Sequence, residues 1–169
     1  MRNMLRIAGV VKESIVDGPG LRFVVFAQGC KHNCFGCQNP HTHSFTGGTL
    51  VTIDSILEQV KKNPLLDGVT LSGGEPFEQA EVLSKLARRV KKLGLNVITY
   101  TGYTYEEIVA GFGELEGWDS LLNATDILVD GRFMLDKKNI LLKFRGSENQ
   151  RIIDVKETMR EKRLVLMSI

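Results

Sequence analysis

The stretch that decides the fold runs from residue 68 to residue 100 and reads GVTLSGGEPFEQAEVLSKLARRVKKLGLNVITY. Residues 68–72 predict a buried strand, which ends at two glycines. Residues 77–93 carry apolar side chains at helical spacing, and Gly94 stands where a left-handed helix terminator belongs. Residues 95–100 predict a second strand. Because a strand reached through a helical crossover returns parallel to the first, this unit predicts a parallel sheet.

The same alternation continues on both sides of this unit. Further strands are predicted at residues 21–27, 126–129 and 140–144, and helices at residues 52–62, 104–110, 115–122 and 152–162, with a last apolar stretch at 164–167. The chain has 169 residues, whereas a closed eight-stranded α/β barrel typically needs about 250. We therefore expect one α/β domain, residues 1–169, with an open parallel sheet or a partial, open parallel β/α barrel of about five to six strands.

Composition excludes several classes of protein. Lysine and arginine number 22 against 20 acidic residues, a formal net charge of +2 that argues for neither a nucleic acid nor an anionic membrane as partner. The apolar run at residues 7–11 is too short for a signal peptide or a membrane span, so a cytoplasmic protein is expected. The three cysteines lie within residues 30–37, whereas a disulfide framework spreads an even number along the chain.

The cysteine spacing, Cys30-x-x-x-Cys34-x-x-Cys37, suits a metal centre because one short loop aims several sulfurs at one point. A [4Fe–4S] cluster normally takes four cysteines, so three would leave one iron without a protein ligand. A zinc site would need a fourth ligand from a loop histidine, His32, His41 or His43. The remaining interpretation is that the cysteines are three buried structural thiols, and the polar residues beside them in the sequence disfavour it. The spacing favours iron–sulfur over zinc, which usually binds two separated ligand pairs.

Several polar groups follow the predicted strands. Residues 72–76, Ser-Gly-Gly-Glu-Pro, place Glu75 at the positive end of the following helix, and the paired glycines allow a close backbone approach. Taken alone, this pentapeptide is more typical of a plain strand-to-helix turn. Thr99, Tyr100 and Asp130 end later strands, although Asp-Gly is also an ordinary turn sequence.

The cysteine spacing resembles the cluster motif of the radical S-adenosylmethionine (SAM) enzymes, and residues 73–75 are similar to that family's GGE motif, which binds the SAM amino group. The resemblance implies that Cys30, Cys34 and Cys37 hold a [4Fe–4S] cluster whose open iron chelates the SAM amino and carboxylate groups. The cluster's electron then cleaves SAM to methionine and a 5′-deoxyadenosyl radical. The SAM contacts implied in this chain are Gly36, Cys37, Gln38, Gly73, Gly74, Glu75, Thr99 and Asp130. The family usually has an aromatic residue where this chain has Gly36.

Further stretches of the sequence resemble particular groups within this family. Residues 17–30, DGPGLRFVVFAQGC, resemble the glycyl-radical-enzyme activating enzymes. Residues 129–133 and 144–151, VDGRF and FRGSENQR, resemble the activating proteins of anaerobic ribonucleoside-triphosphate reductases. The implied activity removes a hydrogen from a glycine Cα of the reductase catalytic subunit, with a flavodoxin-like electron donor. The rivals are a radical SAM enzyme for another glycyl radical enzyme or a small deazapurine precursor, and a non-catalytic zinc-binding module. Residues 145–151 fit a polar turn equally well as a surface for the partner reductase or for polar groups of SAM.

Overall fold

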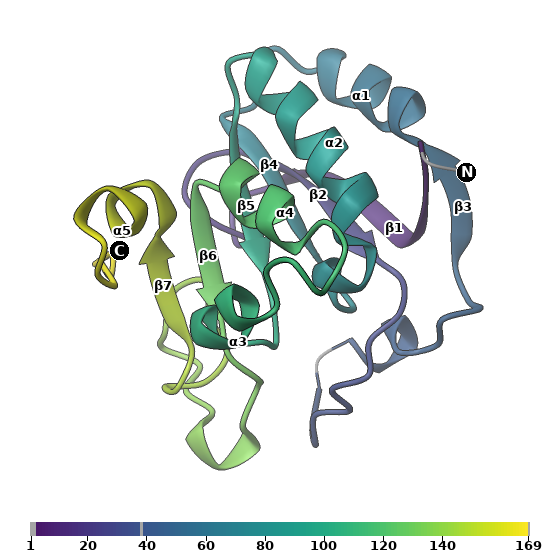
Figure 1. The fold of residues 1–169 in the computed structure, drawn as a ribbon. Coiled ribbons are helices and arrows are strands. Elements are labelled where there is room, and N and C mark those ends of the chain that lie inside the picture. Colours follow the sequence, from purple (N-terminus) through teal and green to yellow (C-terminus); the bar gives the residue numbers. More distant parts are fainter. Residues whose placement is uncertain (1–2, 38, 169) are drawn as a thin grey trace.

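In the computed structural model, which describes residues 3–37 and 39–168, seven strands form one sheet (Figure 1). Across the sheet they are β3 (Thr49–Thr52), β1 (Met4–Ser14), β2 (Arg22–Ala27), β4 (Gly68–Gly73), β5 (Asn96–Tyr100), β6 (Ile127–Asp130) and β7 (Arg151–Asp154). The four strands β2, β4, β5 and β6 run parallel, and the strands outside them pair antiparallel. The predicted parallel sheet therefore forms the centre of a mixed α/β structure.

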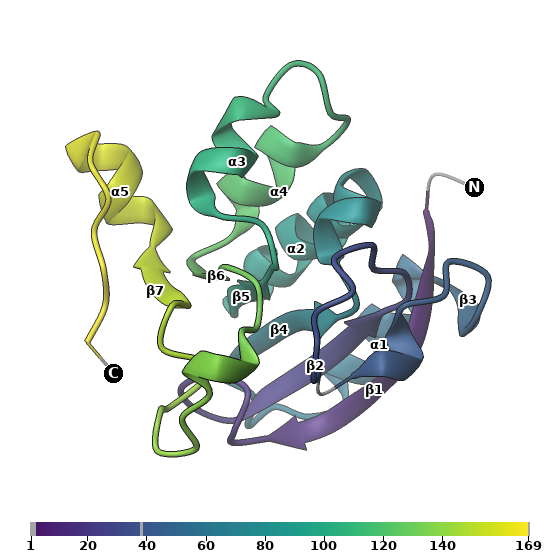
Figure 2. The same ribbon diagram turned by 90° about the horizontal axis from the view of Figure 1, so that it is seen from below.

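Five α-helices accompany the sheet. They are α1 (Ile53–Lys61), α2 (Ala80–Lys92), α3 (Tyr105–Ala110), α4 (Trp118–Ala124) and α5 (Val155–Glu161). Helices α1, α2 and α4 pack side by side over one face of the sheet, as both ribbon views show (Figures 1 and 2). The predicted cap of α1 is present, since Thr52 Oγ1 accepts a hydrogen bond of 3.1 Å from Ser55 N. No helix among the described residues combines the length and apolarity that a bilayer span requires.

Alternation along the strands divides the buried residues between the two faces of the sheet. On β5, Val97 joins the large core beneath the helices. Its neighbour Ile98 belongs to a second, smaller cluster with Val129 and Ile152 on the opposite face. None of the five α-helices covers this opposite face, and loops with short helical turns approach it instead (Figure 2). The loops that follow β2, β4, β5 and β6 emerge at one edge, because parallel strands end together.

Three sequence-based predictions need correction. The sheet has seven strands rather than five or six, because β1 and β3 escaped recognition; a register shift between Ile7 and Gly9 breaks the alternation in β1. Residues 140–144 form no strand, and Ile140 and Leu141 are each 86% exposed at a loop tip. Residues 151–154 form β7 rather than the start of a helix, which begins only at Val155.

Candidate functional site

A cavity of about 510 Å³ lies where the parallel strands end, and all three cysteines line it. The lining comes from segments far apart in the sequence: the β1–β2 loop, the cysteine loop (residues 30–37), the turn after β4, the end of β5 and the β6–β7 loop (residues 131–150). Of the predicted site residues, the structure brings five to this cavity, namely Cys30, Cys34, Cys37, Gly73 and Gly74. A single concave site with convergent thiols is the arrangement expected of a cofactor pocket.

Backbone hydrogen bonds shape the cysteine loop. Cys30 N donates to His43 O at 3.1 Å, and Cys37 N donates to Cys34 O at 3.1 Å. Cys37 Sγ also lies 3.4 Å from Asn39 N and 3.3 Å from His43 Nε2. All three thiols are free and half-buried. Burial raises the pKa of Cys30 to about 11 and also raises that of Cys34. The thiols of Cys30 and Cys34 are therefore protonated at neutral pH until a metal binds, because metal ligation displaces the proton.

The three thiols fit a cluster by their number and their origin. They come from one short loop and line one cavity. In a [4Fe–4S] cluster each cysteine binds a different iron, so three thiols spaced around one cavity fit its demands.

The two glycines after β4 are required by neighbouring backbone. Gly73 has φ of +111°, and a Cβ there would lie 2.4 Å from Ala27 N and O. A Cβ on Gly74 would lie 2.6 Å from Gly29 O. Glu75 N then donates to Gly29 O at 2.8 Å. The paired glycines thus let the turn lie directly against the end of β2, where the cysteine loop begins.

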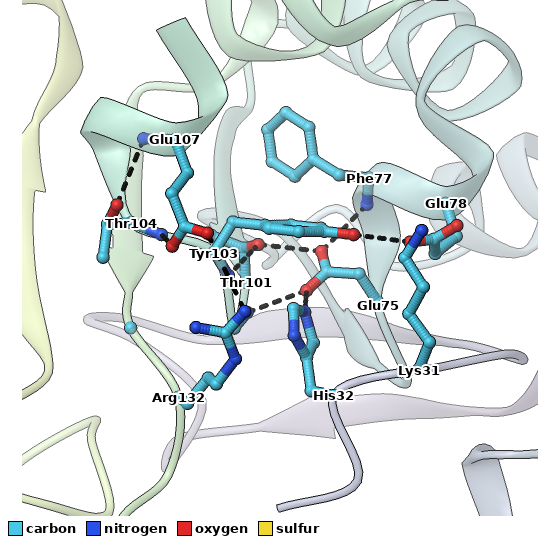
Figure 3. Close-up of polar contacts among 12 residues, drawn as sticks. Lys31, His32, Glu75, Phe77, Glu78, Thr101, Tyr103, Thr104, Glu107 and Arg132 are labelled. Carbon is cyan, nitrogen blue, oxygen red and sulfur yellow. Dashed lines mark hydrogen bonds and ion pairs between the residues drawn. The ribbon is translucent and has the colours of Figure 1, made fainter. Parts of the chain in front are cut away.

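Glu75 is fully buried and its carboxylate accepts four hydrogen bonds (Figure 3). Oε1 accepts from His32 Nε2 at 2.6 Å and Gly102 N at 2.8 Å. Oε2 accepts from Phe77 N at 3.0 Å and Thr101 Oγ1 at 2.8 Å. Four bonds fill the lone pairs of a carboxylate. Glu75 does not line the cavity, and its partner His32 does, so the acid predicted to contact SAM lies behind a histidine of the cysteine loop.

A second acid of the same turn, Glu78, pairs with Lys31, which precedes His32 in the sequence. Glu78 Oε1 lies 3.4 Å from Lys31 Nζ and accepts a hydrogen bond of 2.7 Å from Tyr103 Oη. The Tyr103 ring stands edge-on to the His32 ring, with centroids 4.5 Å apart. Two consecutive residues of the cysteine loop, Lys31 and His32, therefore pair with two acids of one turn, Glu78 and Glu75 (Figure 3).

The other predicted contacts lie elsewhere. Thr99 points to the helix face, where its Oγ1 lies 2.8 Å from Thr125 Oγ1, and its neighbour Tyr100 lines the cavity instead. The Asp130 carboxylate binds Arg151 Nε at 3.0 Å and Nη2 at 2.5 Å, and Gly131 lines the cavity. Hydrogen bonding to Asp130 raises the pKa of Arg151. Gly36 does not line the cavity, and Gln38 falls outside the described residues.

The structure adds residues that the sequence analysis did not assign to the site. Val16 and Asp17, from the β1–β2 loop, line the cavity. Fully buried Arg22 fixes this loop: its Nη1 donates to Pro19 O at 3.1 Å, and its Nε donates at 2.7 Å to Thr70 Oγ1. Burial lowers the pKa of Arg22 to about 10. Arg22 was the sequence signal that could have indicated this loop, since an arginine at the start of a buried strand needs specific hydrogen-bond acceptors.

Comparison with known proteins agrees with these features. A family described as a 4Fe-4S single cluster domain matches residues 16–153. The anaerobic ribonucleoside-triphosphate reductase-activating protein of Haemophilus influenzae is 34% identical over 146 residues, covering 80% of this chain and 89% of that protein. The pyruvate formate-lyase-activating enzyme of Clostridium pasteurianum is 39% identical over 115 residues, covering 63% and 48%. Among solved structures, QueE from Escherichia coli matches with a TM-score of 0.48 and 18% identity, covering 60% and 54%.

Proposed function

The chain belongs to the family of anaerobic ribonucleoside-triphosphate reductase-activating proteins, and from this we propose that it generates the glycyl radical of such a reductase. It is an iron–sulfur enzyme that works with one [4Fe–4S] cluster and SAM. When bound, the reduced cluster supplies the electron that splits SAM into methionine and a 5′-deoxyadenosyl radical, which removes a hydrogen atom from a glycine Cα of the reductase. The single observation that carries this proposal is the convergence of three thiols on one cavity.

Cys30, Cys34 and Cys37 are the proposed cluster ligands. They come from one loop, line one cavity and are free of disulfides. Three thiols leave one iron of a cubane cluster without a protein ligand, and that iron is the proposed docking point for SAM. Free cysteines in such a loop suit a reducing compartment, which supports a cytoplasmic location.

The SAM site proposed here is the cavity beside the cysteine loop. Its volume falls within the range of small-molecule pockets, and Gly73 and Gly74 border it with exposed backbone. Gly36, Cys37 and Gln38 remain proposed contacts from the cysteine loop. At the other strand ends the contacts pass to Tyr100 and Gly131, the lining neighbours of Thr99 and Asp130. Glu75 reaches the SAM amino group only if His32 gives up its hydrogen bond.

The protein substrate is proposed to approach the face of the sheet that carries no α-helix among the described residues. A partial barrel, opened by the antiparallel edge strands, leaves room there for a loop of the reductase. Such a loop would complete the wall of the cavity and exclude water and other hydrogen donors from the radical. A flavodoxin-like protein is the proposed electron donor.

The test uses anaerobic protein with a reconstituted cluster, SAM and a chemical reductant, with and without the reductase. SAM cleavage is expected to be slow alone and faster with the reductase, and electron paramagnetic resonance is expected to show the doublet of a glycyl radical. A reductase carrying alanine at the radical-bearing glycine is the matched control and should give no doublet. Equal cleavage rates with and without the reductase would contradict the proposal, as would a colourless protein containing zinc.

A further inference from the structure

The β6–β7 loop brings one cationic side chain to the cavity. Arg145 lines it together with the three cysteines, and it is the only lysine or arginine among the described residues that do so. We propose that Arg145 binds the carboxylate of SAM, an inference that rests on the function proposed above. The sequence left residues 145–151 open between a polar turn and a surface for the partner reductase or for polar groups of SAM, and the structure singles out Arg145 within this segment.

Hydrogen bonds hold the segment around Arg145 rigidly. Gln150 Oε1 accepts from Gly146 N at 2.8 Å and from Ser147 N at 3.1 Å. Gln150 Nε2 donates to Gly131 O at 3.0 Å, which ties the segment to the end of β6. The glutamine side chain therefore fixes the backbone directly after Arg145 at the cavity wall, and a fixed arginine loses less entropy on binding an anion.

The residue before Arg145 is fixed to a second strand. Tyr100 Oη, at the end of β5, donates to Phe144 O at 2.6 Å. Tyr100 and Phe144 both line the cavity. Arg145 is thus anchored on its two sides by strand ends that belong to the site itself.

The guanidinium keeps donors available for a ligand. Nη1 of Arg145 donates to Gln150 O at 2.7 Å, and the structure shows no ion pair to Arg145 in its described part. Because a guanidinium has five N–H donors, most of them remain free. A half-buried cation without a carboxylate partner is best satisfied by an anionic ligand, and a planar fork suits a carboxylate.

SAM supplies that carboxylate. A carboxylate that binds the open iron through one oxygen keeps lone pairs on the other oxygen, and these can accept hydrogen bonds from Arg145. A glycine within a polypeptide carries no charge, so the reacting residue of the protein substrate gives Arg145 nothing to pair with. The remaining source is an acidic side chain of the reductase, which the experiment separates from SAM.

The experiment compares Arg145→Gln with the wild-type protein and with Lys143→Gln, which removes an exposed positive charge from the same loop. Binding of SAM and of decarboxylated SAM is measured by anaerobic calorimetry on cluster-loaded protein without reductant, so that no turnover occurs. The preference for SAM over the decarboxylated analogue is expected to fall at least tenfold in Arg145→Gln and to stay unchanged in Lys143→Gln. Arg145→Lys, which keeps the charge without the fork, should lie between.

Three outcomes would overturn the inference. An equal loss of affinity for both ligands means that Arg145 only shapes the loop. An unchanged preference means that the SAM carboxylate lies elsewhere, and if the KM for the reductase then rises, the anion belongs to the reductase. The inference also fails if Arg145→Lys keeps the full preference for SAM over the decarboxylated analogue while Arg145→Gln loses its iron. Failure of the proposed function itself looks different: the wild-type protein would then hold no cluster and bind no SAM, or would cleave SAM equally fast with and without the reductase.

Discussion

Replacing Glu75 by glutamine tests how the buried acid holds the site together. Two of its four donors are backbone N–H groups, and they bind different oxygens: Gly102 N binds Oε1 and Phe77 N binds Oε2. A glutamine side chain has one oxygen and one amide nitrogen, so it accepts from only one of these groups. The hydroxyl of Thr101 and the ring of His32 can reverse their roles, but a backbone N–H cannot.

The expected loss follows from this count. One buried backbone N–H is left without an acceptor whichever way the amide is turned, and such a group costs about 1–3 kcal/mol. For a chain of this size that corresponds to a fall in Tm of about 2–12 °C. Urea unfolding of the cluster-free protein, followed by circular dichroism under anaerobic reducing conditions, measures the free energy of unfolding directly.

Glu78→Gln is the matched control on the same turn. Glu78 accepts from the Tyr103 hydroxyl and pairs with Lys31, which is 65% exposed, and neither donor is a backbone group. The glutamine oxygen can still accept from Tyr103, so the loss is expected to stay below about 1 kcal/mol. If Glu75→Gln proves as stable as Glu78→Gln, the four hydrogen bonds of the Glu75 carboxylate do not stabilise the fold. Iron content should be retained in Glu75→Gln and SAM affinity reduced, because a neutral amide holds the histidine that lines the cavity less strongly than a carboxylate does.

Three other substitutions test separate parts of the site. Cys34→Ala is expected to abolish both iron binding and SAM cleavage, since two thiols cannot hold the cluster; iron analysis and the visible spectrum measure the loss. Arg151→Met leaves Asp130, which is 1% exposed, without its ion-pair partner, and should lower the unfolding free energy by about 3–5 kcal/mol in urea. Gly102→Ala would place a methyl group 2.5 Å from His32 Cδ2 and should cost about 1–3 kcal/mol, a loss that shrinks when His32 is also alanine.

Each of these has its own control. His41 is exposed and does not line the cavity, so His41→Ala should keep the cluster that Cys34→Ala loses. Arg160 pairs with Glu157 on the surface, so Arg160→Met should leave the free energy of unfolding nearly unchanged. Additive losses for the Gly102 and His32 substitutions would show that the two side chains do not collide.

Much of the fold could be predicted because its pattern is local. The apolar spacing of α2, the threonine cap of α1 and the glycines after β4 lie within a few residues of one another and report directly on backbone conformation. The same holds for the three thiols, whose spacing on one loop already indicates a cluster. The antiparallel strands escaped prediction because β3 and β7 are only four residues long and β1 is interrupted by a register shift.

The composition of the site was a different matter, because its contacts join residues far apart in the chain. Sequence alone placed Thr99 and Asp130 at strand ends, but a strand alternates its side chains, and a shift of one residue decides which one faces the cavity. Glu75 was recognised as important, yet its partner His32 lies 43 residues away on another loop. Arg145 reaches the cavity on a loop that Tyr100, 44 residues before Phe144, holds against β5. Periodicity and cysteine spacing are properties of short segments, whereas the meeting of four loops at one edge is decided only when the whole sheet has formed.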